Sequence, residues 1–225
     1  MIAVCPSCHD QIHTGDLNIN DAELYQWKNI NRENRPRTAH VYVEPAQSLS
    51  LLTGSITLVT QGNIAVFGLS ASNQLSIRVL DGEYLQITSD LQSFDGREIF
   101  RVVENHVRVG HDPNVCFEFR PGRARVTVPA SASYIPSWVI ERMRHDEPAF
   151  ASDNRVTAFD MTVIRPGVVR VEGFWPSPAG VVVITQEALT FCRLGAGPSP
   201  RIMGHGEETR MHFSKSITSS MFMFA

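Results

Sequence analysis

The sequence is poor in cysteine, has little net charge and contains no long hydrophobic run, and each lack excludes a class of protein. Four cysteines among 225 residues are too few for a disulfide framework. A formal net charge of −3 gives no general attraction to nucleic acid, so such binding would need a local basic patch. No apolar stretch approaches the length of a membrane span, and residues 1–4 lack the regions of a signal peptide. We therefore expect a cytoplasmic protein with no membrane partner.

The composition that remains is that of an ordinary folded protein. Hydrophobic residues make up 43% of the chain and charged residues 19%, which suffices for the core of one or two domains. Cys116 and Cys192 lie in apolar, strand-like runs, so we expect both to be small buried hydrophobic residues. Unpaired cysteines of this kind fit a reducing compartment.

Short runs of Val, Ile, Leu and Phe recur along most of the chain and predict a mainly β fold. Asp81-Gly82 and Asp95-Gly96 lie between such runs and have the chemistry of tight hairpin turns, which require positive φ. A β-sandwich and a β-solenoid-like module both fit this pattern, and the hairpin dipeptides favour the sandwich. The expected strands are 56–59, 64–69, 75–80, 84–88, 99–103, 107–109, 115–119, 124–128, 156–164, 168–174, 181–185 and 188–192.

One helix interrupts the strands, and one proline-containing linker divides the chain. The helix is predicted over 134–144 with Ser137 as its cap. Pro36 blocks continuation of an earlier helix, so we expect an N-terminal segment and linker over 1–37 and an all-β domain over 38–225. Within that domain, two halves over 38–130 and 150–225 are a further interpretation. Residues 216–225 are predicted to be either a last strand or a frayed end.

The first thirteen residues hold a dense set of metal-binding side chains. Cys5 and Cys8 lie three positions apart, His9 follows directly, and His13 lies four residues further on. Thiolates and imidazoles are ligands that zinc prefers, and a tetrahedral zinc needs about four of them. The segment therefore looks like one side of a metal site.

The pattern Cys-Pro-Ser-Cys-His-x-x-x-His-x-Gly is followed by a predicted amphipathic helix carrying Leu24, Trp27 and Lys28. Together they resemble the C-terminal half of an HNH endonuclease domain, over residues 1–34. The resemblance implies a small α-helical remnant of a ββα-metal unit, whose activity is metal-dependent hydrolysis of phosphodiester bonds in DNA. The β-rich remainder resembles no family that we recognise.

The resemblance also implies roles for individual residues. Cys5 and Cys8 correspond to a structural zinc pair, and His9 corresponds to the metal-binding histidine that serves catalysis. His13 lies one helical turn further on and supports the metal or a phosphate. The implied cofactors are structural zinc, if the site is completed, and a catalytic divalent metal such as Mg²⁺, with DNA as partner.

Other parts of the family's site have no counterpart in this sequence. A first Cys-x-x-Cys, the histidine base and the central asparagine would all precede Met1, so we expect Met1 to be an internal methionine of a longer reading frame. The resulting hypothesis is an N-terminally incomplete HNH endonuclease-like protein that is inactive alone. The alternative is a non-enzymatic β-rich binding or structural module with a vestigial metal finger. A carbohydrate-active solenoid is a third reading, for which the sequence shows no clustered carboxylates.

Three further groups of charged residues have two readings each. The linker arginines could contact phosphates or be solvated. The aspartates near the Asp-Gly pairs could form paired carboxylates or serve the turns. The arginines around Pro121-Gly122 could bind an anion or mark a solvated sheet edge. These groups are Arg32, Arg35 and Arg37; Asp81, Asp90 and Asp95; and Arg120, Arg123 and Arg125.

Overall fold

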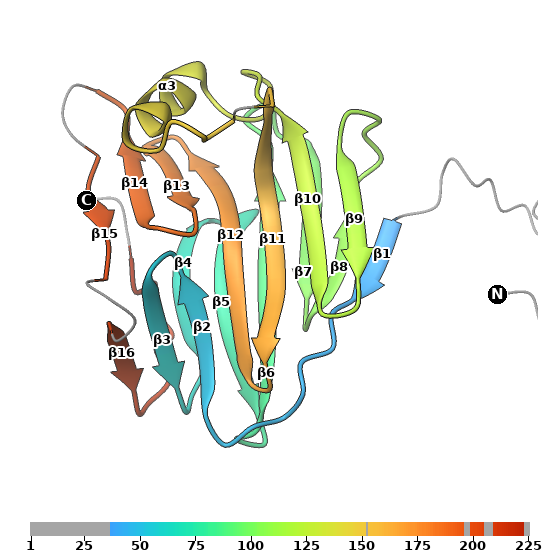
Figure 1. The fold of residues 1–225 in the computed structure, drawn as a ribbon, viewed down its shortest axis with the longest axis vertical. Coiled ribbons are helices and arrows are strands. Elements are labelled where there is room, and N and C mark those ends of the chain that lie inside the picture. Colours follow the sequence, from blue (N-terminus) through green and yellow to red (C-terminus); the bar gives the residue numbers. More distant parts are fainter. Residues whose placement is uncertain (1–36, 152, 196–198, 205–208, 223–225) are drawn as a thin grey trace, which may run out of the picture. The chain divides into compact units, whose positions relative to one another are not determined.

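Hairpins of alternating apolar and polar residues build most of the chain in a computed structural model, which describes residues 37–151, 153–195, 199–204 and 209–222. They form two mainly antiparallel sheets (Figure 1). The six-stranded sheet A has the order β1 (Arg37–His40), β8 (His106–Val109), β7 (Glu98–Val103), β6 (Tyr84–Gln92), β5 (Asn73–Leu80) and β4 (Ile64–Ser70).

The larger sheet B contains ten strands. Its main path runs through β15 (Arg201–Ile202), β14 (Leu189–Arg193), β13 (Gly180–Ile184), β12 (Val168–Ser177), β11 (Arg155–Arg165), β10 (Arg123–Pro129) and β9 (Cys116–Arg120). β2 (Leu49–Thr53) runs parallel to the first half of β12 and antiparallel to β3 (Ile56–Thr60), and β16 (Arg210–Phe213) runs parallel to β3.

The turns explain why hairpins form where the sequence predicts them. Asp81 and Gly82 both adopt positive φ, at 52° and 75°, between β5 and β6. Gly96 adopts a φ of 85° between β6 and β7. Such turns make neighbouring strands antiparallel, so the architecture is a sandwich and not a solenoid.

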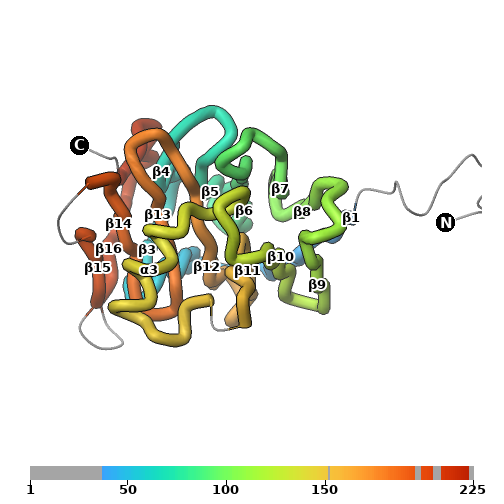
Figure 2. The backbone as a smooth tube through the Cα atoms, turned by 90° about the horizontal axis from the view of Figure 1, so that it is seen from above, coloured from blue at the N-terminus to red at the C-terminus, as the bar shows by residue number. Residues whose placement is uncertain are grey.

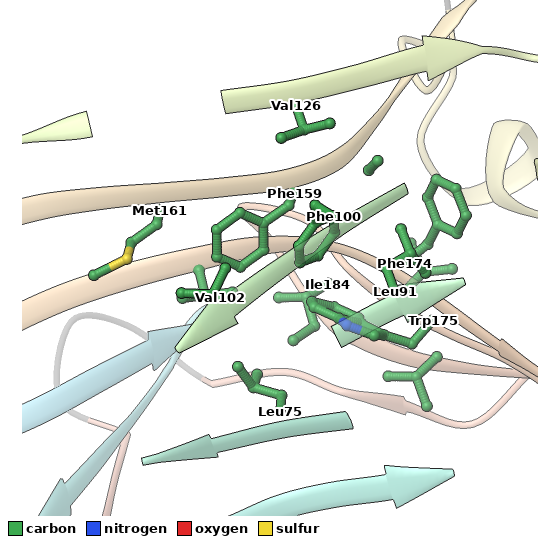
Figure 3. Close-up of a cluster of buried hydrophobic side chains, with 14 of the residues drawn as sticks. Leu75, Leu91, Phe100, Val102, Val126, Phe159, Met161, Phe174, Trp175 and Ile184 are labelled. Atoms are coloured by element: carbon green, nitrogen blue, oxygen red, sulfur yellow. The ribbon is translucent and has the colours of Figure 1, made fainter. Parts of the chain in front are cut away.

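The inner faces of the two sheets pack on each other and form the core (Figures 2 and 3). Phe100 of sheet A contacts Phe159 of sheet B, with ring centroids 4.6 Å apart. Trp175 is fully buried, lies edge-on to Phe67 at 5.0 Å, and donates its indole N–H to the Ser89 hydroxyl across the sheets. Burial of these large side chains is the main stabilising contribution between the layers.

The single helix of the described residues, α3 (Ser137–Asp146), covers one end of the outer face of sheet B (Figures 1 and 2). Its buried face consists of Val139, Ile140 and Met143. Because α3 covers the outer face of sheet B here, every residue of β13 is buried, including those that point away from the core between the sheets. The expected cap is wrong: Pro136 occupies the N-cap, and Ser137 is the first helical residue and makes no capping hydrogen bond.

Two further expectations need correction. The halves 38–130 and 150–225 do not separate, because β10 pairs with β11 along seven residues and β2 pairs with β12. Cys116 is exposed, because the alternation of β9 turns its neighbour Phe117 toward the core, whereas Cys192 is buried as expected. Burial raises the pKa of the Cys192 thiol to about 11.

The chain after β16 closes one side of the sandwich. Ile217 forms a parallel bridge with Ile64 of β4, and the N–H groups of Met221 and Phe222 donate to carbonyls of Ala65 and Val66. The last described segment therefore pairs along β4 and is not frayed. In the part of the chain that the structure covers, no helix has the length and apolar character needed to cross a membrane.

Candidate functional site

The residues proposed as metal ligands, Cys5, Cys8, His9 and His13, lie outside the described residues, as do Arg32 and Arg35. The structure therefore leaves their roles as predictions. Among the residues it does describe, no group of three or more His, Cys, Asp or Glu side chains is placed to hold a metal ion.

The other charged candidates serve the fold. Arg37 donates to the carbonyls of Val115 and Asp112, at 2.7 and 3.1 Å, and so fastens β1 to the loop between β8 and β9. Asp90 accepts hydrogen bonds from Gln74 and Arg101. Asp95 pairs with Arg97 and lies in the turn that its sequence predicts. These contacts support the structural readings of these residues.

The outer face of sheet B carries a row of four charged residues, one on each of four neighbouring strands. Glu118 of β9 lies opposite Arg125 of β10, which lies opposite Asp160 of β11, which lies opposite Glu172 of β12. A β-bulge between Val126 and Thr127 sets this register, because it shifts the pairing of β10 with β11 by one residue. Side chains that are directly opposite on one face lie close enough to interact.

Asp160 is the anchor of this row. Its side chain is only 5% exposed, and its carboxylate receives both Nε and a terminal nitrogen of Arg123. The Thr162 hydroxyl donates to it at 3.0 Å, and Arg125 Nε lies 3.5 Å away. Arg123 and Arg125 are thus directed to a carboxylate and not to a free anion site at the hairpin tip.

Glu172 differs from its neighbour Asp160 in having no partner. It is half-buried, and within the described part of the chain its carboxylate receives no hydrogen bond and forms no ion pair. Burial raises the pKa of Glu172 above its usual range, and the negative charge of Asp160 adds to the shift. Arg170, two residues earlier on β12, also has a buried Nε without a hydrogen bond. A buried polar group without a hydrogen bond, such as Arg170 Nε, is costly, whereas the Glu172 carboxylate is not fully buried and is open to a ligand in the recess.

Glu172 faces an open recess of about 630 Å³. Sheet B forms its floor, and residues 146–151, 153 and 185–187 form its walls. The charged residues of its lining are Glu118, Arg125, Asp146, Glu147, Asp153, Arg155, Glu172 and Glu187, and Phe150 is its one aromatic residue.

One wall of the recess is held by a cluster of charges at the end of α3. Glu147 accepts hydrogen bonds from Thr185 and Arg201, and Arg201 also pairs with Asp146 at 3.3 Å. Burial raises the pKa of Glu147, although its hydrogen bond with Thr185 and the charge of Arg201 act in the opposite direction. These contacts tie α3 to β13 and β15 and so fix the shape of the recess.

Carboxylates outnumber guanidinium groups in the recess by six to two. Both arginines have partners already: Arg125 with Thr157 and Asp160, and Arg155 with Thr127 and the Asn114 carbonyl. Glu118, Asp153, Glu172 and Glu187 form no ion pair with any described residue. The recess therefore has a negative local charge, which favours a cation over a phosphate.

Comparisons with protein-family models, with curated proteins and with solved structures found no match to this chain. Neither Asp160 nor Glu172 stood out in the sequence, since each is one polar residue in an alternating strand. The only sequence signal was a pair of charged residues spaced two apart in each of β10 and β12, Arg123 with Arg125 and Arg170 with Glu172.

Proposed function

We propose that residues 37–225 are a binding module, and that the recess on sheet B binds a cationic group of its ligand, such as a lysine or arginine side chain. The observation that carries this proposal is Glu172, a half-buried carboxylate that faces the recess without a hydrogen bond or ion pair from the described residues. A bound ammonium or guanidinium group would supply the missing partner.

The pair formed by Asp160 and Glu172 does not fit a hydrolase that would use these two carboxylates. Such a mechanism needs two acids that both reach the substrate. Asp160 lies directly opposite Glu172 but is almost fully buried and is held by Arg123. Glu172 is thus the one member of the pair that a ligand in the recess can contact, which favours binding over catalysis.

The test is titration of the full chain with Nα-acetyl-arginine amide and Nα-acetyl-lysine amide, followed by NMR shifts of backbone amides. We expect saturable shifts around Glu172 that weaken with salt, and about tenfold weaker binding in Glu172→Gln, because a charge-assisted hydrogen bond is lost. Glu104→Gln is the matched control, since Glu104 pairs with Arg78 on the other sheet. Equal binding of neutral Nα-acetyl-glutamine amide, or unchanged binding by Glu172→Gln, would refute the proposal.

A second proposal concerns residues 1–34, and the Cys-x-x-Cys-His pattern supports it. On this proposal Cys5 and Cys8 bind structural zinc and His9 a catalytic divalent metal such as Mg²⁺, with His13 beside them and DNA as the substrate. The binding module would then be an accessory domain of an HNH endonuclease-like protein in the cytoplasm, and this chain alone would be inactive.

Cobalt titration of the purified chain tests the metal half of this second proposal. We expect absorption bands typical of two thiolates, lost in Cys5→Ala, and no cleavage of plasmid DNA with Mg²⁺ or Mn²⁺. Four protein donors from within these 225 residues, or cleavage of the plasmid, would show that the site is complete.

A further inference from the structure

Among the residues that the structure describes, β9 is an edge strand of sheet B, paired with β10 on one side only. The edge of sheet A at β4 is covered by residues 217–222, and β15 has only two residues. With five residues, β9 is longer than the other unpaired edges of the described part, which are β1 and β16 with four residues each and β15 with two. Unpaired edges of this kind are templates for another strand.

The side chains of β9 alternate between two faces. Glu118 and Arg120 lie on the outer face, where neither forms a hydrogen bond or ion pair with a described residue. Phe117 and Phe119 lie on the inner face, opposite the buried Val126 and Ala124. Phe117 packs against the core, but Phe119 is 50% exposed because it extends past the cover that sheet A provides.

We propose that two copies of this chain associate through β9, as an antiparallel pair about a two-fold axis centred on Phe119. In this register the two Phe119 rings are directly opposite. Glu118 of each copy lies opposite Arg120 of the other, so two charge pairs form. The two B sheets become one continuous sheet, and the exposed rings are buried.

The side chains select this register among the alternatives. Residues that lie directly opposite each other in an antiparallel pair point to the same face of the sheet. The two-fold axis therefore passes through a residue of β9, and the alternative registers place it at other residues of the strand. Centring on Glu118 would place the two Glu118 carboxylates opposite each other, which is repulsive. Centring on Phe117 would place Cys116 opposite Glu118, with no charge pair. Of these registers, only the one centred on Phe119 places Glu118 and Arg120 of one copy opposite Arg120 and Glu118 of the other.

Charges on an edge strand usually deter pairing with another strand, but the charges of Glu118 and Arg120 do not deter pairing of β9 with its own copy. A single sign repeated along β9 would repel its own copy. A negative and a positive residue two positions apart on one face instead match their own copy, because in an antiparallel pair each lies opposite the other's charge. The same pattern would repel a strand whose charges lie in another order, so the edge is selective for itself.

The test is the mass of the full chain in solution, by sedimentation equilibrium at concentrations up to about 100 μM. We expect a species of twice the 25.1 kDa chain mass. Glu118→Arg and Arg120→Glu should each weaken association at least tenfold, since two attractive pairs become repulsive. An equimolar mixture of these two variants should associate again, because their charges are complementary. A monomer throughout, or a dimer that neither variant weakens, overturns the proposal.

Disulfide trapping tests the register independently. Phe119→Cys should form an intermolecular disulfide between the two substituted positions under mild oxidation, because residues directly opposite in an antiparallel pair have suitable spacing. Glu118→Cys is the control, since that position lies opposite Arg120 in this register. Linked peptides are identified by mass spectrometry, and a disulfide between two copies of position 118 would refute the register.

This inference does not rest on the proposed function. Arg120 does not line the recess, so Arg120→Glu should weaken association at least tenfold while leaving the shifts around Glu172 with Nα-acetyl-arginine amide in place. Conversely, Glu172→Gln should weaken binding of that probe and leave the mass of the assembly unchanged.

Discussion

Asp160 and Glu172 are chemically similar carboxylates on the same face of sheet B, and their surroundings give them different roles. Asp160 is buried and receives hydrogen bonds from Arg123 and Thr162, so it holds β10 and β11 together. Glu172 is half-buried and lacks such donors among the described residues, and burial raises its pKa. The first is a structural anion, and the second is available to a ligand.

The raised pKa of Glu172 predicts a pH-dependent stability. Between its usual value of 4.5 and its raised value, the folded state binds more protons than the unfolded state, so this group lowers stability as pH rises. Glu172→Gln cannot ionise and should avoid this loss. Urea unfolding should therefore show a free-energy difference in favour of the variant that is larger at about pH 8 than at about pH 4.

The contribution of Glu147, whose pKa is also raised, is common to both proteins and cancels in this difference. A difference that stays constant over the pH range would contradict the assigned environment of Glu172.

Asp160→Asn should be strongly destabilising. The substitution removes the charge that pairs with Arg123 at a nearly buried position, and because Arg123 is itself partly exposed the cost is about 2 kcal/mol. Urea unfolding at neutral pH measures this loss. Glu104→Gln, in the exposed pair with Arg78, should change the free energy of unfolding by less than about 0.5 kcal/mol. Equal losses in the two variants would show that Asp160 does not anchor the sheet.

At the scale of elements, the two sheets are joined where strands pass from one to the other. The chain crosses between β3 and β4 at residues 61–63, and the segment after β16 makes the same crossing beside it. The Asn63 N–H donates to the Ser216 hydroxyl there. A Cβ atom on Gly62 would lie only 2.7 Å from the Ser216 nitrogen, so glycine permits this close approach.

Deleting residues 215–225 should loosen β4 specifically. The Ala65 N–H donates to the Ile217 carbonyl at 2.9 Å, and the Gly68 N–H donates to the Ser220 hydroxyl at 2.9 Å. Both amides should exchange with solvent at least about tenfold faster in the truncated chain, while amides in the centre of β6 stay protected. Hydrogen exchange followed by NMR measures this, and unchanged protection of Ala65 would contradict the pairing.

At the scale of the whole molecule, residues 37–225 form a compact unit of their own. Nearly all buried hydrophobic residues found in the described part, with Val168 and Ala188 as the exceptions, belong to one cluster between and around the two sheets. A chain with such a core has the stabilising contacts that folding requires.

We therefore expect residues 37–225 to fold without residues 1–36. Urea unfolding followed by circular dichroism should give a single cooperative transition, with a free energy within about 1 kcal/mol of that of the full chain. Loss of the β transition in the shorter chain would show that the N-terminal segment is required for the fold.

Much of the fold followed from local pattern, whereas little of the site did. The alternation in β5 and the Asp81-Gly82 turn predicted a hairpin at the right place, because both signals are local. β1 was missed because it is short and pairs with β8 far along the chain, and β2 was missed although it forms a local hairpin with β3. Asp160 and Glu172 were missed because a polar residue in a strand marks an outward face and not a site.

The sequence by itself determined the mainly β character, the sandwich-forming hairpins and the presence of a metal-ligand pattern over residues 5–13, since these depend on residues that are neighbours in the chain. Only the tertiary structure decided that Glu118, Arg125, Asp160 and Glu172 share one row, and that β9 lies at an edge. The physical reason is that strand order and the bulge after Val126 set which side chains meet. Both depend on packing between segments far apart in the sequence, such as Ser89 and Trp175, which are 86 residues apart, or β2 and β12.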